Sequence, residues 1–225
     1  MDKDASSLIL KNLKDIQQRL PPDVLLVAAA KTRSTEEVIS AITGGIRSIG
    51  YNYVQEADRM HQLIPNTVQW HMIGHLQRNK TKKAVRIFDM IETIDSEDLA
   101  VEVNKLCMSI DKIMPVLIEI NSGKESNKTG VLPGKVESLI LKINHLSNLK
   151  IMGLMTMGPR FGNPEDARPY FRTTRSIFEQ IKRTRIEGVE MKYLSMGMSN
   201  SFKIAVEEGA NIVRIGTLLF GDRCT

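Results

Sequence analysis

The amino-acid sequence predicts an α/β protein folded as a single (β/α)8 barrel of the TIM type, with an extra N-terminal helix. Three observations support this fold class. Strand-like and helix-like segments alternate along the chain, which is typical of a parallel sheet with crossover helices. The 225 residues allow about 28 residues for each of eight strand–helix units, which is short but sufficient for a barrel. No linker or low-complexity tract divides the chain, so we expect one domain over residues 1–225.

The chain opens with an amphipathic segment at 6–20 that is predicted to form a helix ended by Pro21 and Pro22, and residues 1–22 are expected to pack on the barrel. Eight predicted strands follow, at 24–30, 47–50, 68–73, 89–93, 115–120, 149–155, 190–194 and 212–215. The second and fourth are short. If either of them does not form, an open sheet of six or seven strands is the alternative.

Predicted helices fill the intervals between the strands, and several carry signals at their ends. Ser34 with Glu37 three residues later has the pattern of a capping box, and Gly44 closes that helix. The next helix runs to about residue 63, and the later ones are predicted at 79–86, 96–110, 133–144, 166–184 and 200–208. Ser96 is the expected cap of its helix, and Gly209 ends the last one.

The composition excludes several classes of protein. Hydrophobic residues make up 42% and charged residues 25%, a balance that is typical of a globular chain and not of a disordered or fibrous one. Cys107 and Cys224 are too few for a disulfide framework and lack metal-ligand spacing. The longest apolar run, 24–30, is far too short to span a bilayer, and the N-terminus lacks the apolar core of a signal peptide. We therefore expect a cytoplasmic protein with no membrane contact.

The net charge of +5 raises the question of a nucleic-acid partner. The basic residues gather in two predicted helical segments, at 80–86 and 168–185. Aromatic residues make up only 5% of the chain, and no aromatic-rich motif is present that could stack bases. We interpret both helix faces as solvated surface and expect no nucleic-acid partner. The excess of positive charge would still favour a small anionic ligand.

In such barrels the chemistry gathers where the strands lead into the loops before their helices. The first predicted strand leads into Lys31 after seven apolar residues. Partial removal from water disfavours the charged form of a lysine, so its amine becomes a nucleophile that can form a Schiff base with an aldehyde. Position alone also allows a lysine whose ammonium group simply extends into water.

The last two predicted strands end in turns that suit an anion. After the seventh strand, Gly197 permits a tight turn and Ser199 is placed to cap the next helix. After the eighth strand, Gly216 lets a ligand approach the backbone and Thr217 adds a hydroxyl donor. The loops after strands seven and eight often bind phosphate in these barrels. A nucleophilic lysine and a phosphate site in one barrel mouth together indicate pyridoxal 5′-phosphate (PLP).

Other polar residues near the strand ends have more than one interpretation. Arg214 could face the cofactor ring and keep the ring nitrogen unprotonated, since a guanidinium does not release its proton, or it could face the outer helices. Asn52 could bond a ring hydroxyl or cap the following helix. His71 is interpreted as an interior histidine with its hydrogen bonds satisfied. Because His71 and His75 have no carboxylate adjacent in the sequence, no metal site is predicted.

The sequence resembles the pyridoxal phosphate homeostasis protein family, which shares the fold of the N-terminal barrel of alanine racemases. The matching stretches run in the family's order over nearly the whole chain: 29–32, 52–56, 70–80, 128–130, 153–156, 194–199, 213–217 and 220–221. The stretches at 70–80 and 194–199 are the most specific of these. The resemblance implies the same barrel, without the second β domain of alanine racemases.

The resemblance implies PLP as the cofactor and assigns roles to individual residues. The implied cofactor-binding residues are Lys31, Asn52, Ser199, Arg214, Gly216 and Thr217. Lys31 matches the Schiff-base lysine, Arg214 the residue facing the pyridine nitrogen, and Asn52 a residue beside the ring. The other three match phosphate-binding positions. The family usually has a glutamate directly before the asparagine, so Tyr51 predicts altered hydrogen bonding around Asn52.

The resemblance also implies a function. The family is thought to bind and deliver PLP and to keep this reactive aldehyde under control, without robust catalysis. Alanine racemases have a second, β-rich domain with an opposing catalytic residue, and this chain ends a few residues after the eighth strand. A racemase needs an acid or base on each face of the carbanion, so we expect no vigorous turnover, with a PLP-dependent racemase-like enzyme as the alternative. PLP-requiring apo-enzymes are candidate partners, and the chain is expected to be a monomer or weak dimer.

Overall fold

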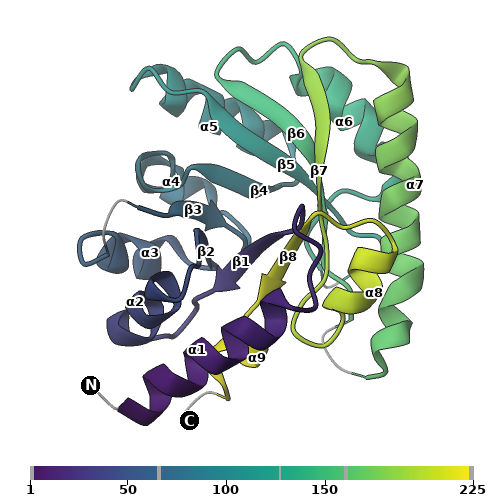
Figure 1. Ribbon diagram of the computed structural model, residues 1–225. Helices are drawn as coiled ribbons and strands as arrows, with labels where there is room; N and C mark the ends of the chain where they lie inside the picture. The colour runs from purple at the N-terminus through teal and green to yellow at the C-terminus, as the bar shows by residue number, and fades with distance from the viewer. Residues whose placement is uncertain (1–2, 65–66, 127, 160–161, 223–225) are drawn as a thin grey trace.

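The computed structural model describes residues 3–64, 67–126, 128–159 and 162–222. In this part of the chain, parallel strands form a closed barrel in sequence order, with helices on the outside (Figure 1). The strands are β1 (Leu25–Ala29), β2 (Ser48–Tyr51), β3 (Gln69–Met72), β4 (Met90–Ile94), β5 (Met114–Ile120), β6 (Leu149–Thr156), β7 (Val189–Ser195) and β8 (Ile212–Ile215). All eight predicted strands are present and β8 pairs with β1, so the barrel prediction is confirmed and the open sheet is excluded.

Helices surround this barrel. The α-helices are α1 (Lys3–Gln17), α2 (Thr35–Thr43), α3 (Val54–His61), α4 (Thr81–Ile87), α5 (Glu97–Met108), α6 (Val136–Ile143), α7 (Arg168–Thr184), α8 (Phe202–Glu207) and α9 (Thr217–Phe220). Short 3-10 turns, η1 (Arg78–Lys80), η2 (Pro133–Lys135) and η3 (Pro164–Ala167), precede α4, α6 and α7. The predicted helices are present with ends shifted by a few residues. The four-residue α9 has no counterpart in the prediction, because a single turn is too short to show a helical period.

The predicted caps behave differently at α2 and α5. At α2, the hydroxyl of Ser34 accepts a hydrogen bond from the amide of Glu37, and the Glu37 carboxylate accepts one from the amide of Ser34, so the capping box is confirmed. At α5, Ser96 is at the N-cap position, but its hydroxyl donates to the carboxylate of Asp95. The expected side-chain cap is therefore wrong, because the neighbouring carboxylate is a strong acceptor for this hydroxyl.

Helix α1 packs against α2 and α9, beside the place where β8 meets β1 (Figure 1). Its buried face consists of Ile9, Leu13 and Ile16, which recur at intervals of three and four residues. The side-chain amide of Asn12 donates to the carbonyl oxygen of Leu219 in α9 over 3.1 Å. The first helix thereby fixes the segment that follows β8. No helix in the described residues is both long and apolar enough to cross a membrane.

The strands separate two hydrophobic layers, because successive side chains of a strand point to opposite faces. The layer between strands and helices contains large residues such as Ile49, Trp70 and Phe171, whereas Val27 and Met155 belong to the barrel interior. On four strands an apolar interior residue is followed two positions later by a polar one: Met90 by Glu92, Leu117 by Glu119, Tyr193 by Ser195, and Ile212 by Arg214. The interior therefore becomes polar toward the carboxyl ends of these strands.

Candidate functional site

The residues predicted to bind the cofactor lie on or directly after β1, β2, β7 and β8. These strands are contiguous in the barrel, because β1 pairs with both β2 and β8, and β8 pairs with β7. All of them are parallel, so the loops that follow them share the mouth at the carboxyl end of the barrel. The fold thus gathers residues from opposite ends of the chain into one site.

Lys31 lies at the rim of this mouth. Val27 and Ala29 of β1 face the barrel interior, and Lys31 is the next residue in that alternation. Its side chain is half-buried, with the ammonium nitrogen 5.3 Å from the centroid of the Tyr53 ring. Tyr53, which follows β2, was not among the residues predicted for the site. The Tyr53 ring is itself 53% exposed, so this cation–π contact lies at the solvent-facing edge of the loops after β1 and β2.

The turn that follows Lys31 is fixed by an unusual backbone conformation. Thr32 has a φ of 61°, a region that β-branched residues rarely adopt. Its amide donates to the carboxylate of Glu56 in α3 over 3.1 Å, and its hydroxyl donates to the carbonyl oxygen of Lys31 over 2.7 Å. These contacts hold the backbone at the lysine.

Ser199 joins the loops after β7 and β8. Its hydroxyl oxygen accepts hydrogen bonds from the amides of Gly216 and Leu218, each over 3.2 Å. A single oxygen at this position thus receives two backbone donors, which is the arrangement that binds an anion oxygen. The expected role of Ser199 as the N-cap of α8 is wrong. Ser201 is at that position, because two further residues of turn separate Ser199 from the helix.

Two glycines allow these loops to approach each other and the strands. Gly197 has a φ of 95°, and a Cβ atom there would lie 2.6 Å from the Cβ of Ala205, so no other residue fits without a shift. Gly216 lies against the end of β1, where an added Cβ would be 3.3 Å from the carbonyl oxygen of Ala29. The turn at Gly216 is therefore next to the end of β1, two residues before Lys31. Thr217 is exposed as the first residue of α9, and its carbonyl oxygen accepts from Gly221.

Asn52 does not cap α3. The N-cap residue is Tyr53, which makes no side-chain cap, and the half-buried Asn52 amide has no hydrogen-bond partner among the described residues. Gly74 packs on its backbone, where an added Cβ would lie 2.5 Å from the Asn52 carbonyl oxygen. Of the two interpretations of Asn52, capping is thus wrong, and the amide is free to bond a ligand.

Tyr51 points away from the mouth. Its ring stacks on that of Trp70 with the centroids 5.5 Å apart, inside the layer between strands and helices. Burial raises the pKa of its hydroxyl, and the nearby negative charge of Glu56 adds to this. Because the side chain belongs to the outer layer, the Tyr51 hydroxyl makes no bond to Asn52 and has no hydrogen-bond partner in the described structure. The altered hydrogen bonding expected around Asn52 stays a prediction.

Arg214 extends into the barrel interior, so the interpretation that placed it toward the outer helices is wrong. It is 4% exposed. Its Nη1 donates to the hydroxyl of Ser195 and lies 3.7 Å from a carboxylate oxygen of Glu92, and its Nη2 donates to the carbonyl oxygen of Thr156 over 2.8 Å. Burial lowers the pKa of Arg214, although the charges of Glu92 and Glu119 oppose this. The guanidinium is the principal cation inside the barrel.

Glu92 connects Arg214 to His71. One carboxylate oxygen of Glu92 lies 2.7 Å from His71 Nδ1, and the other accepts from Ser195 over 2.6 Å. Burial alone raises the pKa of this carboxyl, but the hydrogen bond and charge of His71, the charge of Arg214 and the bond from Ser195 together hold it below its usual value. The interior position predicted for His71 is confirmed, but only Nδ1 has a partner; Nε2 has none in the described structure.

Glu119 is a second carboxyl in the interior, and sequence reasoning missed it together with Glu92 and Ser195. Its Oε1 accepts from the hydroxyl of Thr129 over 2.9 Å, and its Oε2 has no partner among the described residues. Burial raises the pKa of Glu119, against the effect of the Thr129 bond. A carboxylate in a mostly apolar strand is the signal in the sequence that could have revealed Glu92 and Glu119. Ser195 gives no such signal, because β7 also carries Glu190 and Lys192.

The histidines have carboxylate neighbours that the sequence did not indicate. Besides the Glu92 contact of His71, His75 Nδ1 lies 3.4 Å from the carboxylate of Asp95. These carboxylates are not adjacent in the sequence, since β4 and the residue after it bring them from about twenty residues away. Even so, no three His, Cys, Asp or Glu side chains of the described ranges gather closely enough to hold a metal ion.

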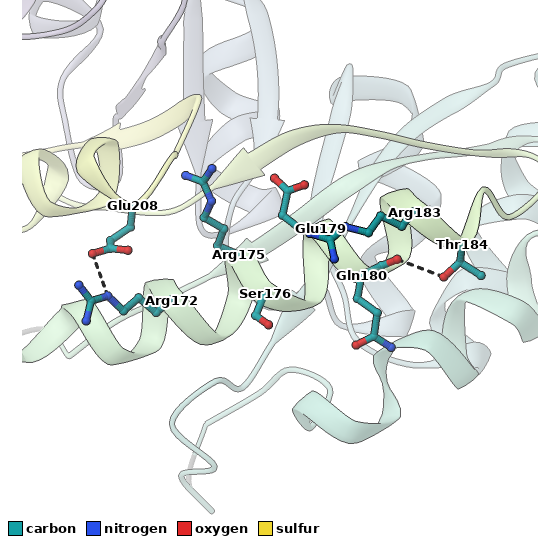
Figure 2. Close-up of a pocket in the computed structure, with 8 residues that line it drawn as sticks. All are labelled: Arg172, Arg175, Ser176, Glu179, Gln180, Arg183, Thr184 and Glu208. Carbon is teal, nitrogen blue, oxygen red and sulfur yellow. Dashed lines mark hydrogen bonds and ion pairs between the residues drawn. The ribbon is translucent and has the colours of Figure 1, made fainter.

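A hollow of about 760 Å³ lies elsewhere, along the outer face of α7 (Figure 2). Part of its basic lining is neutralised within the chain, because Arg172 pairs with Glu208 over 3.1 Å. Arg168, one turn earlier on α7 and outside the lining, binds Glu165, Glu207 and Glu208. This pairing is consistent with a solvated helix face, as the charge pattern predicts. The barrel mouth therefore remains the candidate site.

The class of protein to which the chain belongs follows from its similarity to known proteins. Residues 6–224 match the family model of the alanine racemase N-terminal domain, so the chain belongs to that family. The solved alanine racemase of Clostridium difficile 630 has the same barrel, with a TM-score of 0.78 at 15% identity. That match covers 97% of this chain and 57% of the racemase chain.

Within this class, the chain is a member of the pyridoxal phosphate homeostasis protein family, as its motifs predict. The protein of that name from Aquifex aeolicus is 41% identical over 199 residues, which cover 88% of this chain and 86% of the relative. The Schizosaccharomyces pombe protein is 36% identical over 206 residues, covering 90% and 86%. PipY of Synechococcus elongatus, solved with PLP bound, has a TM-score of 0.86 at 30% identity and covers 95% of this chain and 100% of its own.

Proposed function

We propose that the protein binds PLP in the barrel mouth as a Schiff base on Lys31, and that this binding serves cofactor homeostasis in the cytoplasm. The observation that carries the proposal is the position of Ser199, whose hydroxyl oxygen accepts from two backbone amides beside β1, the strand that precedes Lys31. An amine and an anion site in one mouth fit a phosphorylated aldehyde. The PLP-bound structure of PipY, which shares this fold at 30% identity, supports the proposal.

The residues of the mouth fit the chemical groups of PLP. The amides of Gly216 and Leu218 with the hydroxyls of Ser199 and Thr217 would hold the phosphate, since each can donate to an anion. The unpaired side-chain amide of Asn52 suits a ring substituent. When bound, PLP supplies an aldehyde for the lysine amine and a ring that withdraws electrons. In the free protein that amine lies over the exposed Tyr53 ring, 5.3 Å from its centroid.

Arg214 favours binding over vigorous turnover. A guanidinium donates hydrogen bonds but does not release a proton, so beside the pyridine nitrogen it would leave that nitrogen unprotonated. An unprotonated ring withdraws electrons less strongly, which limits carbanion chemistry on amino acids. Transfer of the cofactor to PLP-requiring apo-enzymes, by a monomer or weak dimer, is the companion proposal. Its test is reactivation of an apo-enzyme by the loaded protein in the presence of a scavenger of free PLP.

The test of the main proposal is the absorption spectrum of the PLP-loaded protein before and after borohydride reduction, followed by peptide mapping. We expect a visible band that borohydride bleaches and a reduced adduct on Lys31. The Lys31→Ala variant should fold and lose the adduct. Lys192→Ala is the matched control, because that ammonium also lies over a tyrosine ring, 5.0 Å from the centroid, but is exposed elsewhere. An adduct on Lys31→Ala, or its loss in Lys192→Ala, would refute the assignment.

A further inference from the structure

The barrel interior buries a hydrogen-bonded series of side chains from four different strands: His71 on β3, Glu92 on β4, Ser195 on β7 and Arg214 on β8. We propose that Glu92 is the positioning residue of the cofactor site, holding Arg214 through Ser195 and balancing its charge, so that Glu92 sets the electrostatic environment of bound PLP. This inference rests on the function proposed above. It assigns a role to a residue that none of the recognised motifs includes.

The direction of the hydrogen bonds makes Ser195 a fixed link. Its single proton is donated to Glu92 over 2.6 Å, so its oxygen is left to accept from Arg214 Nη1. The direct separation of Arg214 and Glu92 is 3.7 Å, within ion-pair distance but too long for a hydrogen bond. Arg214 therefore responds to Glu92 in two ways, through the serine and through charge.

Glu92 itself cannot easily turn. Its two oxygens are engaged on different sides, by His71 Nδ1 over 2.7 Å and by Ser195. The Thr156 carbonyl on β6 fixes the second terminal nitrogen of Arg214. The guanidinium is thus oriented by groups on β4, β6 and β7, although it belongs to β8.

Charge balance explains why a carboxylate is needed here. Arg214 and Glu92 are both buried, and a buried cation is strongly disfavoured unless an anion or hydrogen bonds compensate it. Glu119 on β5 also acts on Arg214, but its hydrogen bond goes to Thr129 and burial favours its neutral form. The other titratable groups nearby are His71 on β3, which contacts Glu92, and the pair His75 and Asp95, which lie near Glu119. Glu92 is the carboxylate that supplies the counter-charge.

The test compares Glu92→Gln with Glu119→Gln, both PLP-loaded, by following the visible band of the Schiff base as pH is varied. Loss of a negative charge makes the protonated Schiff base less favourable, so we expect Glu92→Gln to lower the titration midpoint by about one pH unit, a tenfold change in the equilibrium. Glu119→Gln should shift it by less than about a third of that, because Glu119 hydrogen-bonds to Thr129 and makes no bond to the Ser195–Arg214 pair. Equal shifts, or no shift in Glu92→Gln, would overturn the proposal.

If Glu92→Gln does not fold, Ser195→Ala tests the positioning role of Glu92 instead. It removes the hydroxyl that connects Glu92 to Arg214 and leaves both charges in place. We expect weaker induced circular dichroism of the bound PLP, since Arg214 loses its anchor, with thermal unfolding showing an intact fold. Unchanged dichroism would refute the positioning role. A wild-type protein without a borohydride adduct would instead refute the proposed function, so the two failures are distinguishable.

Discussion

Replacing Ser199 by alanine tests the anion site directly. In the free protein, the Ser199 hydroxyl oxygen accepts from two amides over 3.2 Å, and with phosphate bound the hydroxyl can donate to an anion oxygen. A hydrogen bond to a charged group contributes about 1.5–3 kcal/mol. Part of this is offset, because the variant no longer has a side chain that competes with the ligand for the amides, an effect of about 0.5–1.5 kcal/mol. The net loss is about 1–2 kcal/mol, which raises the Kd for PLP roughly 5- to 30-fold.

The assay is a spectrophotometric titration of the apo-protein with PLP and, separately, with pyridoxal, which lacks the phosphate. We expect Ser199→Ala to weaken PLP binding by that factor and to leave pyridoxal binding unchanged. Ser201→Ala is the matched control, because this buried hydroxyl accepts from the amide of Met198 over 3.3 Å in the same loop but does not reach the α9 amides. PLP affinity within twofold of the wild type, or equal weakening for pyridoxal, would show that Ser199 is not at the phosphate.

Three further predictions concern stability. Gly197→Ala should destabilise the fold by about 2–4 kcal/mol in urea unfolding, since it combines a positive φ with a close contact to Ala205, whereas Gly134→Ala, with no atom within 4 Å, should not. Tyr51→Phe should be neutral or stabilising in thermal melts, because the buried hydroxyl that it removes has no hydrogen-bond partner in the described structure; a loss above about 1 kcal/mol would contradict this. The raised pKa of Glu119 means that the folded state binds the carboxyl proton more tightly than the unfolded state does. The contribution of Glu119 to the free energy of unfolding therefore falls as the pH rises above the pKa that this carboxyl has in the unfolded chain. Glu119→Gln should therefore be more stable than the wild type at pH 8 and similar at pH 4, and the opposite order in unfolding at these two pH values would refute it.

The order and type of the elements could be predicted because each depends on nearby residues. The apolar run before Lys31 and the Ser34–Glu37 capping box carry their signals within a few positions. The short β2 and β4 were also predicted, because the helical patterns on both sides leave only a few residues between them, enough for a short strand. The prediction was wrong where a serine hydroxyl bonds a group outside its own helix. Ser96 donates to the carboxylate of Asp95, and Ser199 accepts from amides seventeen and nineteen residues away.

The sequence alone determined which residues stand at the strand ends, because strand and turn chemistry is local: Lys31 after β1, and Ser199 and Gly216 after β7 and β8. Only the tertiary structure decided which way the strand residues face. Tyr51 faces the helices and stacks on Trp70, whereas Arg214 faces the barrel interior and lies near Glu92, 122 positions earlier in the chain. The facing of a strand residue depends on closure and register, and these are fixed by packing among all eight strands. The charge environment of the site therefore belongs to the closed barrel and to no single motif.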